Sequence, residues 1–319
     1  MINKLTSIPT LADIKETHQA IQKFIHRTPI LTSESINKIA GTQIFFKCEN
    51  FQKIGAFKMR GAASAAMRLT EEEKNKGLAT HSSGNHAQAV SRSAQILNIP
   101  AYIVMPENAP SVKRAATKGY GAEVISCAST LQARESTLER VVAEKGATFI
   151  HPYNDYNVIA GQATAALELL EDVSDLDIVM APVGGGGLMS GSALTAHALN
   201  PKIRAIGSEP KEVDDAYRSL QAGSLQINET TNTIADGLRT TLGEKTLEIL
   251  RRELEEIILV EEQEIIDAMR MVWERMKIII EPSCAVPLAA VLKQKQKFAN
   301  QRVGIIITGG NVDLSKLPF

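Results

Sequence analysis

The amino-acid sequence predicts an α/β protein whose parallel sheets are covered by helices on both faces. Short apolar segments alternate along the chain with stretches in which apolar residues recur at helical spacing. Strands that alternate with helices form βαβ units, and such units build parallel sheets. Several of the apolar segments are continuous rather than alternating, as strands buried on both faces are.

The expected strands are spread over most of the chain. In chain order they are Gln43–Cys48, Leu78–His81, Ala101–Met105, Glu123–Cys127, Thr148–His151, Asp177–Val183, Arg204–Glu209, Ile257–Val260 and Val303–Thr308. Helical spacing is clear between most of them, as in Thr130–Lys145 and Glu262–Lys277. Gly146 directly follows the first of these helices and is expected to form its C-cap, because glycine tolerates the left-handed conformation found there.

Length and composition limit the number of domains and the classes of partner. The chain has 319 residues, of which 44% are hydrophobic and 22% are charged. At about 150 residues per domain this length predicts two domains, and the composition excludes wholesale disorder. The formal net charge of −1 gives no electrostatic reason to expect nucleic acid or an anionic membrane as a partner. Three cysteines without a CxxC motif favour neither a disulfide framework nor a cysteine-based zinc site.

One uncharged stretch, residues 178–200, is long enough to cross a membrane. It contains Pro182 and four consecutive glycines, which would leave backbone groups unsatisfied in lipid. We therefore expect a buried strand, a glycine loop and a helix there, and no membrane partner. The first residues lack the apolar segment of a secretory signal, so a cytoplasmic location is expected.

The first motif with a chemical meaning is the glycine loop Gly184-Gly185-Gly186-Gly187. It follows an apolar strand and precedes a helix that is expected to begin at Leu188. Glycines let the backbone approach an anion closely, and a helix N-terminus offers free N–H donors, so the loop predicts a phosphate site. Neither the GxGxxG pattern of dinucleotide-binding proteins nor the GK[ST] of P-loops fits it. The alternative is a tight turn that binds nothing.

A second motif, Gly55–Gly61, places Lys58 between Phe57 and Met59 at the start of a helical stretch. Burial beside these side chains would lower the pKa of the amine and make it a nucleophile toward carbonyl groups. The motif by itself favours the alternative, a solvated lysine at a helix start, because most lysines are exposed.

Polar segments follow two further strands. The segment His81–Gln88 opens a helix, and its hydroxyls, amide and backbone N–H groups suit a carboxylate, although a simple serine N-cap is the alternative. The segment Thr308–Asp313 ends the last strand, where ligands bind in open parallel sheets, and a plain turn is the alternative.

Two carboxylates lie close together in the sequence. Glu209 ends an expected strand, and Asp215 follows six residues later. With a backbone carbonyl between them they offer an oxygen-only site for a hard cation. Their spacing alone favours the alternative, in which carboxylates cap a helix N-terminus.

In this order, the motifs resemble those of the serine racemase and serine/threonine dehydratase family, which are fold-type II pyridoxal 5'-phosphate (PLP) enzymes with a tryptophan synthase β-like fold. Matching stretches run from Thr28 to Asp313, which is nearly the whole chain. They are Phe46–Glu49, Gly55–Gly61, Ser82–Gln88, Ile159–Gln162, Gly184–Gly187, Ala235–Gly237, Trp273–Lys277, Glu281-Pro282 and Gly309–Asp313. We expect a small domain of residues 77–154 inserted in a large PLP-binding domain of residues 1–76 and 155–319.

The resemblance implies a role for each matching residue. Lys58 would hold PLP covalently, Phe57 would pack against its ring, Asn85 would bind the ring hydroxyl and Thr308 would face the pyridine nitrogen. The phosphate would lie on Gly184–Gly187 and the Leu188 amide, with Gly237 and Glu281 also at the cofactor. The substrate carboxylate would be held by Ser82, Ser83, Asn85 and His86. A divalent cation (Mg²⁺, or else Mn²⁺ or Ca²⁺) would bind Glu209, the Val213 carbonyl and Asp215.

The implied activity is loss of the β-hydroxyl from serine or threonine, which gives a 2-oxo acid and ammonia. Lys58 and Ser83 would lie on opposite faces of the cofactor, so the resemblance also implies serine racemisation. One alternative is threo-3-hydroxyaspartate ammonia-lyase, whose second carboxylate would need a cation such as Arg134, although a solvated helix arginine is the favoured interpretation of that residue. The motifs also leave open a β-replacement synthase and a non-catalytic protein that binds PLP or an amino acid.

The resemblance further implies a homodimer and an ATP effector site. Lys53, Gln88 and Tyr120 match that nucleotide site, whereas Ile54 departs from the usual small or polar residue. The sequence stops soon after Asp313, so no regulatory domain of the kind found in feedback-inhibited threonine deaminases is expected.

Overall fold

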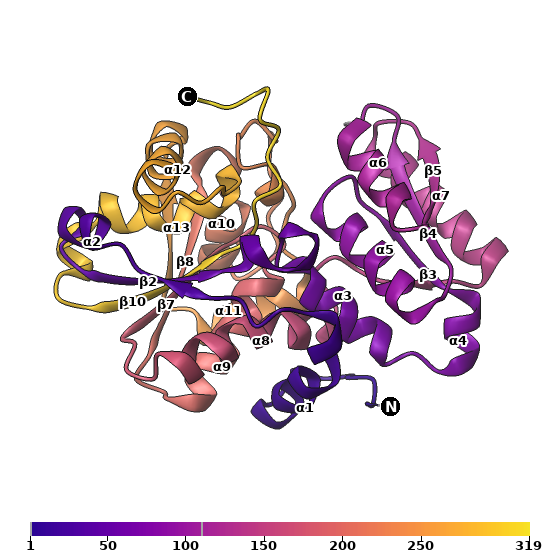
Figure 1. Cartoon of the computed structure of the whole chain (residues 1–319), viewed down its shortest axis with the longest axis horizontal. Coiled ribbons are helices and arrows are strands. Elements are labelled where there is room, and N and C mark those ends of the chain that lie inside the picture. Colours follow the sequence, from indigo (N-terminus) through magenta and orange to yellow (C-terminus); the bar gives the residue numbers. More distant parts are fainter. Residues whose placement is uncertain (1, 110) are drawn as a thin grey trace.

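The chain folds around two separate sheets, with helices on the faces of both (Figure 1). The computed structural model describes residues 2–109 and 111–319, and only the backbone of residues 111 and 112. One sheet contains strands from both ends of the chain, and the other contains the strands between residues 78 and 149.

The larger sheet has six strands in the order β1-β2-β10-β7-β8-β9. Their bounds are Ile30–Leu31 for β1, Gln43–Cys48 for β2, Ile178–Pro182 for β7, Arg204–Pro210 for β8, Glu256–Val260 for β9 and Arg302–Ile307 for β10. All neighbours are parallel except β1, which pairs antiparallel with β2. The sequence did not indicate β1, because two residues are too few to show a period.

Helices cover both faces of this sheet. On one face lie α2 (Glu34–Ala40), α12 (Glu262–Met276) and α13 (Pro282–Lys293), and on the other lie α8 (Tyr156–Asp172), α9 (Gly187–Leu199) and α11 (Glu244–Glu253). Successive residues of β7 show the consequence, since Val179 packs into the second layer and Met180 into the first. Burial on both faces is therefore the reason that this strand is continuously apolar.

The smaller sheet has four parallel strands in the order β5-β4-β3-β6. Their bounds are Leu78–His81 for β3, Ala101–Pro106 for β4, Glu123–Cys127 for β5 and Thr148–Phe149 for β6. Helix α5 (Asn85–Leu97) packs on one face and α7 (Leu131–Lys145) on the other, with α6 (Ser111–Gly119) leading into β5.

Helix α3 (Lys58–Met67) lies between the two sheets and packs against both α5 and α8 (Figure 1). Its contact with α8 is a direct backbone approach, because a Cβ atom on Gly161 would lie 2.4 Å from the carbonyl oxygen of Arg60. The first turns of α3 are therefore fixed against α8 without room for adjustment.

The remaining elements are further helices and 3₁₀ turns. They are α1 (Leu11–Ile21), α4 (Glu71–Lys76), α10 (Asp215–Ala222), α14 (Lys295–Phe298) and the 3₁₀ turns η1 (Gln22–Phe24), η2 (Glu49–Phe51), η3 (Lys53–Gly55), η4 (Lys211–Val213) and η5 (Asp236–Leu238).

The predicted α/β class and every expected strand are confirmed, with small differences in bounds. The strand expected at Thr148–His151 is shorter, because after Phe149 the chain turns and the ring of His151 accepts hydrogen bonds from the next loop. Gly146 has φ +67° at the end of α7, as expected of a C-cap. Within the described residues no helix is long and apolar enough to cross a membrane. The division into domains at residues 77–154 stays a prediction, although all strands of the smaller sheet fall inside this range.

Candidate active site

Lys58 is the first residue of α3, and its side chain is partly buried. Its Nζ donates a hydrogen bond of 2.7 Å to the carbonyl oxygen of Pro152 and lies 5.1 Å from the centroid of the Phe57 ring. Burial lowers the pKa of the amine to about 8, and the negative charge of Glu281 partly opposes this effect. The structure therefore supports the desolvated lysine over the solvated alternative.

The end of β10 meets the start of α3. The backbone N–H of Phe57 donates to the Thr308 carbonyl at 2.9 Å, so Thr308 lies next to the turn that carries Lys58. The Thr308 hydroxyl is buried and lies 3.1 Å from Cys284 Sγ, which also accepts a hydrogen bond from the Gly309 N–H. Cys284 thus fixes the side chain that the resemblance places at the pyridine nitrogen.

The glycine loop is closely covered by protein. Gly186 has φ +84°, a left-handed conformation that glycine adopts at no steric cost, and α9 begins one residue later. The Tyr153 ring lies against Gly185, where a Cβ atom would approach it to 2.2 Å. Since Tyr153 follows the carbonyl that accepts from Lys58, the loop and the lysine lie at the same site. The first N–H groups of α9 have no partner within the helix and are available to an anion.

Replacing Gly185 with alanine should reduce both stability and affinity for a phosphate-bearing cofactor. The added methyl group would overlap the Tyr153 ring, and overpacking of this kind costs about 1–3 kcal/mol. Thermal denaturation and a PLP titration would measure the two effects. Gly119→Ala is the matched control, because a Cβ atom there meets nothing within 4 Å. Equal behaviour of the two variants would contradict the close packing of the loop.

A chain of amide hydrogen bonds crosses the site. Asn85 Nδ2 donates to both carboxylate oxygens of Glu281, at 3.0 and 3.1 Å, and Asn85 Oδ1 accepts from Asn311 Nδ2 at 2.8 Å. Asn311 also donates to the carbonyl of Ile54. Burial raises the pKa of Glu281 to about 7, and the charge of Asp236 adds to this effect. The orientation of the Asn85 amide is fixed, because a carboxylate can only be matched by its N–H side.

Gly237 lies beside the glycine loop. Its backbone N–H donates to Ser283 Oγ at 3.0 Å, and a Cβ atom on Gly184 would come within 3.1 Å of its carbonyl oxygen. The structure therefore brings together residues that the sequence separates by about fifty positions.

The N-terminus of α5 contains the residues that the sequence assigns to a carboxylate site. Ser82 Oγ accepts from the Gly84 N–H, and the His86 ring is buried with Nε2 bonded to the Ile150 carbonyl. Burial lowers the pKa of His86 to about 3, so the ring is neutral and its Nε2–H is already used. In the role that the resemblance implies for His86, the donor to a carboxylate would therefore be its backbone N–H. Ser83 is partly buried between β3 and α5, at the carboxyl edge of the smaller sheet.

Glu209 and Asp215 are both buried, and each already accepts hydrogen bonds. Glu209 accepts from the N–H groups of Ala216 and Tyr217 at the start of α10, which agrees with the capping alternative. Asp215 accepts from Asn228 Nδ2 and from the Leu242 N–H. Burial raises the pKa of Asp215 to about 6, and it also raises the pKa of Glu209, with the charge of Asp215 adding to the effect on Glu209. Among the described residues no three His, Cys, Asp or Glu side chains gather as at a metal centre.

Sequence reasoning missed four residues at the site. They are Pro152, Tyr153, Cys284 and Asn311. Asn311 lies in the segment Thr308–Asp313, but the motif assigned it no role of its own. The mainly polar segment His151–Asp155, one residue after β6, was a usable signal, since ligand sites form beyond the carboxyl ends of parallel strands. Cys284 gave no signal, because a buried cysteine resembles any small apolar residue in a helix.

A partly buried lysine with a lowered pKa, beside a glycine loop and between two sheets, is the arrangement expected of an enzyme that holds a phosphorylated aldehyde as its cofactor. A family model described as "Pyridoxal-phosphate dependent enzyme" matches residues 21–309, and the chain belongs to this family. The predicted cofactor, PLP, and the prediction that the protein is an enzyme are thereby confirmed.

The chain is similar to individual members over almost its whole length. It is 54% identical to a serine racemase of Dictyostelium discoideum, covering 97% of this chain and 96% of the relative. It is 48% identical to a beta-hydroxyaspartate dehydratase of Paracoccus denitrificans, covering 98% of this chain and 99% of the relative.

The fold agrees with these similarities. The crystal structure of the Dictyostelium discoideum serine racemase superposes with a TM-score of 0.92, covering 96% of this chain and 99% of the other. The expected resemblance to serine racemases and their fold is therefore confirmed.

Proposed function

We propose that the protein is a PLP-dependent ammonia-lyase that converts serine and threonine to 2-oxo acids and ammonia, and that also racemises serine. The observation that carries the proposal is Lys58, a partly buried amine with a lowered pKa, placed where α3, the end of β10 and the glycine loop meet. The similarity to a serine racemase supports this substrate class.

When bound, PLP supplies an electron sink that makes the Cα–H of an amino acid acidic. Lys58 holds the cofactor before substrate arrives and then accepts the Cα proton at Nζ. Its lowered pKa keeps part of the amine unprotonated near neutral pH, as a base requires.

The residues around Lys58 fit the cofactor. Gly184–Gly187 and the Leu188 amide would hold the phosphate, because a backbone without side chains approaches it closely. Phe57 would pack against the ring, and the Thr308 hydroxyl would meet the ring nitrogen. Asn85 would bind the ring hydroxyl through one Nδ2–H and keep Glu281 as the partner of the second, in place of the two contacts that Nδ2 now makes to this carboxylate. Gly237 borders the phosphate loop.

The N-terminus of α5 is the proposed carboxylate site. The backbone N–H groups of Asn85 and His86 lie in the first turn of the helix and have no partner within it. The hydroxyls of Ser82 and Ser83 add donors at the same edge. A substrate held there would have its Cα between Lys58 and Ser83, so that each could move a proton on one face.

Glu209, Asp215 and the Val213 carbonyl are the proposed ligands of a divalent cation. Their oxygen-only chemistry suits Mg²⁺, Mn²⁺ or Ca²⁺. Both carboxylates are buried, and the pKa of each is raised, which fits a place where positive charge is expected. Such a cation would stabilise the start of α10 and the adjoining glycine-loop region.

Adding Mg²⁺ should raise the thermal midpoint of the protein, and EDTA should lower it. A ligand present at a hundred times its dissociation constant stabilises the folded state by about 2.7 kcal/mol. Glu209→Gln and Asp215→Asn should abolish the response. Asp214→Asn should keep it, since Asp214 pairs with Arg218 instead. A shift that persists in all three variants would exclude this site.

A threo-3-hydroxyaspartate ammonia-lyase is the second candidate. The observation that favours it is the position of Arg134, whose charge, after burial, lowers the pKa of His81. The Nε of Arg134 donates to the Thr130 carbonyl at 3.4 Å on the exposed side of α7. In this second candidate the guanidinium would turn toward His81 and Ser82 to meet the second carboxylate of the substrate. The similarity to a beta-hydroxyaspartate dehydratase supports this candidate as well.

Arg134→Gln should lower kcat/KM for 3-hydroxyaspartate about tenfold and leave that for L-serine within about threefold. Only the first substrate carries the extra carboxylate. Arg140→Gln is the matched control, because Arg140 lies on the same helix and pairs with Glu144. An equal loss for both substrates would mean that Arg134 does not contact the β-carboxylate.

The experiment that tests the proposed function is 2-oxo acid release from L-serine, D-serine, L-threonine and the diastereomers of 3-hydroxyaspartate. Chiral analysis of the remaining serine from the same samples measures racemisation. Dominant turnover of serine or threonine with accumulation of D-serine is the expected result. Dominant turnover of 3-hydroxyaspartate would favour the second candidate, and neither turnover nor PLP absorbance would favour a binding protein.

Three further features belong to this proposal. The protein is a homodimer in the cytoplasm, and its small domain, residues 77–154, closes over the cofactor to exclude water. ATP is a weak effector at most, because Ile54 stands where relatives with an ATP effector site have a small or polar residue.

A further inference from the structure

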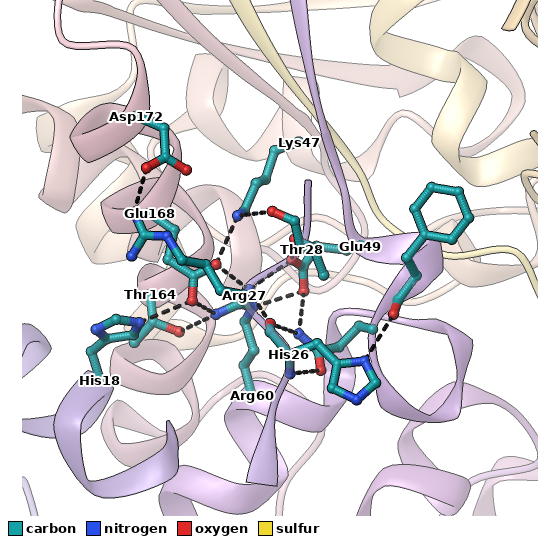
Figure 2. A network of polar contacts seen from close by, with 12 residues as sticks. His18, His26, Arg27, Thr28, Lys47, Glu49, Arg60, Thr164, Glu168 and Asp172 are labelled. Carbon is teal, nitrogen blue, oxygen red and sulfur yellow. Dashed lines mark hydrogen bonds and ion pairs between the residues drawn. The ribbon is translucent and has the colours of Figure 1, made fainter. Parts of the chain in front are cut away.

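A network of buried charges surrounds Arg60, a residue of α3, the helix that begins at Lys58 (Figure 2). Lys47, Glu49, Arg60 and Glu168 are its core, and none of these four residues has any exposed surface. The charges balance, since Lys47 and Arg60 face Glu49 and Glu168. The proposed mechanism uses none of them.

The Arg60 guanidinium is held on two sides. Its Nε and Nη2 donate to Glu49 Oε2 and Oε1 at 2.7 and 2.8 Å. Its Nη1 and Nη2 donate to Glu168 Oε1 and Oε2 at 2.9 and 2.8 Å, and Nη1 also donates to Thr164 Oγ1 at 3.1 Å. Every N–H of the guanidinium is therefore used, and its plane is fixed by two bidentate pairs.

Lys47, Glu49 and Glu168 make further polar contacts, in which Thr28 and His18 take part. Lys47 Nζ lies 2.7 Å from Glu168 Oε2 and donates to the Thr28 carbonyl at 2.7 Å. Thr28 Oγ1 donates to Glu49 at 2.5 Å, and His18 Nε2 pairs with Glu168 at 2.9 Å. Burial alone would raise the pKa of Glu168, but its hydrogen bonds to His18 and Arg60 hold the pKa below the usual range.

The network joins elements that lie far apart in the sequence. Lys47 belongs to β2, Glu49 to η2, Arg60 to α3 and Glu168 to α8. Arg60 follows Lys58 by two residues, which is about 200° around a helix. The network therefore holds the side of the first turn of α3 that faces away from Lys58.

This first turn has no side-chain cap of its own. Phe57 occupies the N-cap position and makes no capping hydrogen bond through its side chain. The turn is held instead by the Phe57 N–H to Thr308 on the site side and by Arg60 on the far side. One residue later, Gly61 packs against the Gln162 side chain, where a Cβ atom would approach Nε2 to 2.3 Å.

Stability alone does not account for a buried group of four charges. Removing charges from water is costly, and apolar side chains of similar volume often stabilise a core as well or better. What a fully satisfied bidentate network supplies is a single fixed geometry. Here that geometry is imposed two residues from the catalytic amine.

We propose that the Arg60–Glu49–Glu168–Lys47 network is a positioning device that aims the Lys58 amine into the active site. Its members are positioning residues, since all four are fully buried and none is among the proposed substrate or cofactor contacts. The inference rests on the proposed role of Lys58. Misplacement of a reacting group by about 1 Å can cost about 100-fold in rate.

Three variants of the full-length protein test this inference. Arg60→Lys keeps the charge but cannot form two bidentate pairs. Glu168→Gln keeps the shape but leaves a buried positive charge uncompensated. The double variant Lys47→Met with Glu168→Gln removes one positive and one negative charge, so the network is balanced again. It still lacks the bidentate pair between Arg60 and the Glu168 carboxylate. Arg27→Gln is the control, because Arg27 pairs with Glu171 and Asp172 on the exposed side of α8.

Four quantities are measured on each protein: the thermal midpoint, kcat, KM and the rate at which cofactor-stripped protein regains the visible absorbance of bound PLP. We expect the double variant to recover the thermal midpoint lost in Glu168→Gln. Its kcat and its rate of PLP capture should stay about 10- to 100-fold below the wild type, with KM within about threefold. Arg60→Lys should show the same loss of kcat.

Recovery of kcat and of PLP capture together with the thermal midpoint would overturn the inference and leave the network a purely structural one. Unchanged kcat in Arg60→Lys would overturn it too. Failure of the wild type itself to bind PLP or release 2-oxo acid would instead refute the proposed function, so the two failures are distinguishable.

Discussion

Lys58→Ala should abolish 2-oxo acid release from L-serine, with a fall in rate of at least about 1,000-fold. In the proposed mechanism the Nζ atom both holds the cofactor and accepts the Cα proton, so its removal eliminates two functions at once. Lys58→Arg should be equally inactive, because a guanidinium stays protonated. The rate of 2-oxo acid formation and the visible absorbance of PLP measure the effect.

The lowered pKa of the Lys58 amine also predicts that the rate of PLP capture depends on pH. An amine is nucleophilic only when unprotonated, and the pKa of Lys58 is about 8 in the protein without cofactor. The rate at which cofactor-stripped protein captures PLP should therefore rise with pH and level off above about 8. Lys76→Ala, which removes an exposed lysine paired with Glu72, should change neither rate nor profile. Retained turnover in Lys58→Ala would refute the assignment.

Ser83→Ala should abolish serine racemisation, with a loss of at least about 100-fold, while elimination from the L-enantiomer stays within about threefold. Inversion at Cα needs a proton donor or acceptor on each face, whereas elimination needs only the Lys58 face. Chiral analysis of serine and 2-oxo acid assays on the same samples separate the two activities.

Ser82→Ala is the matched control for this variant. Ser82 is adjacent, and its hydroxyl accepts the N–H of Gly84, so it belongs to the same turn but not to the proposed pair. We expect it to weaken both activities together through the carboxylate site. If Ser83→Ala lost elimination and racemisation equally, the model of two opposed groups would be wrong.

Much of the fold could be predicted from local patterns. The strand Ile178–Pro182 is apolar throughout because Val179 and Met180 are buried in opposite layers, and this pattern is visible in the sequence. The turn at Gly146 was equally local, since the left-handed conformation favours glycine. The strand β1 could not be predicted, because it depends on pairing with β2 and not on its own two residues.

The site was predictable to a different degree at each residue. Lys58 stood in a recognisable motif, but the motif could not decide whether its amine was solvated. The structure decided it, because the Pro152 carbonyl lies 94 residues away in sequence and 2.7 Å away in space. For Glu209 the structure shows the capping contacts that the spacing had favoured, and the cation stays a proposal.

By itself, then, the sequence determined the α/β class, the positions of most strands along the chain and the motifs of a PLP enzyme, because periodicity and motif spacing are local properties of the chain. Only the tertiary structure decided what surrounds the turn that carries the lysine. Thr308 and Cys284 lie on one side, and the buried Arg60 guanidinium with its carboxylate partners lies on the other. The physical reason is that desolvation and bidentate pairing depend on contacts across the fold. Glu168, for example, is 108 residues from Arg60 in the chain and within hydrogen-bonding distance of it in space.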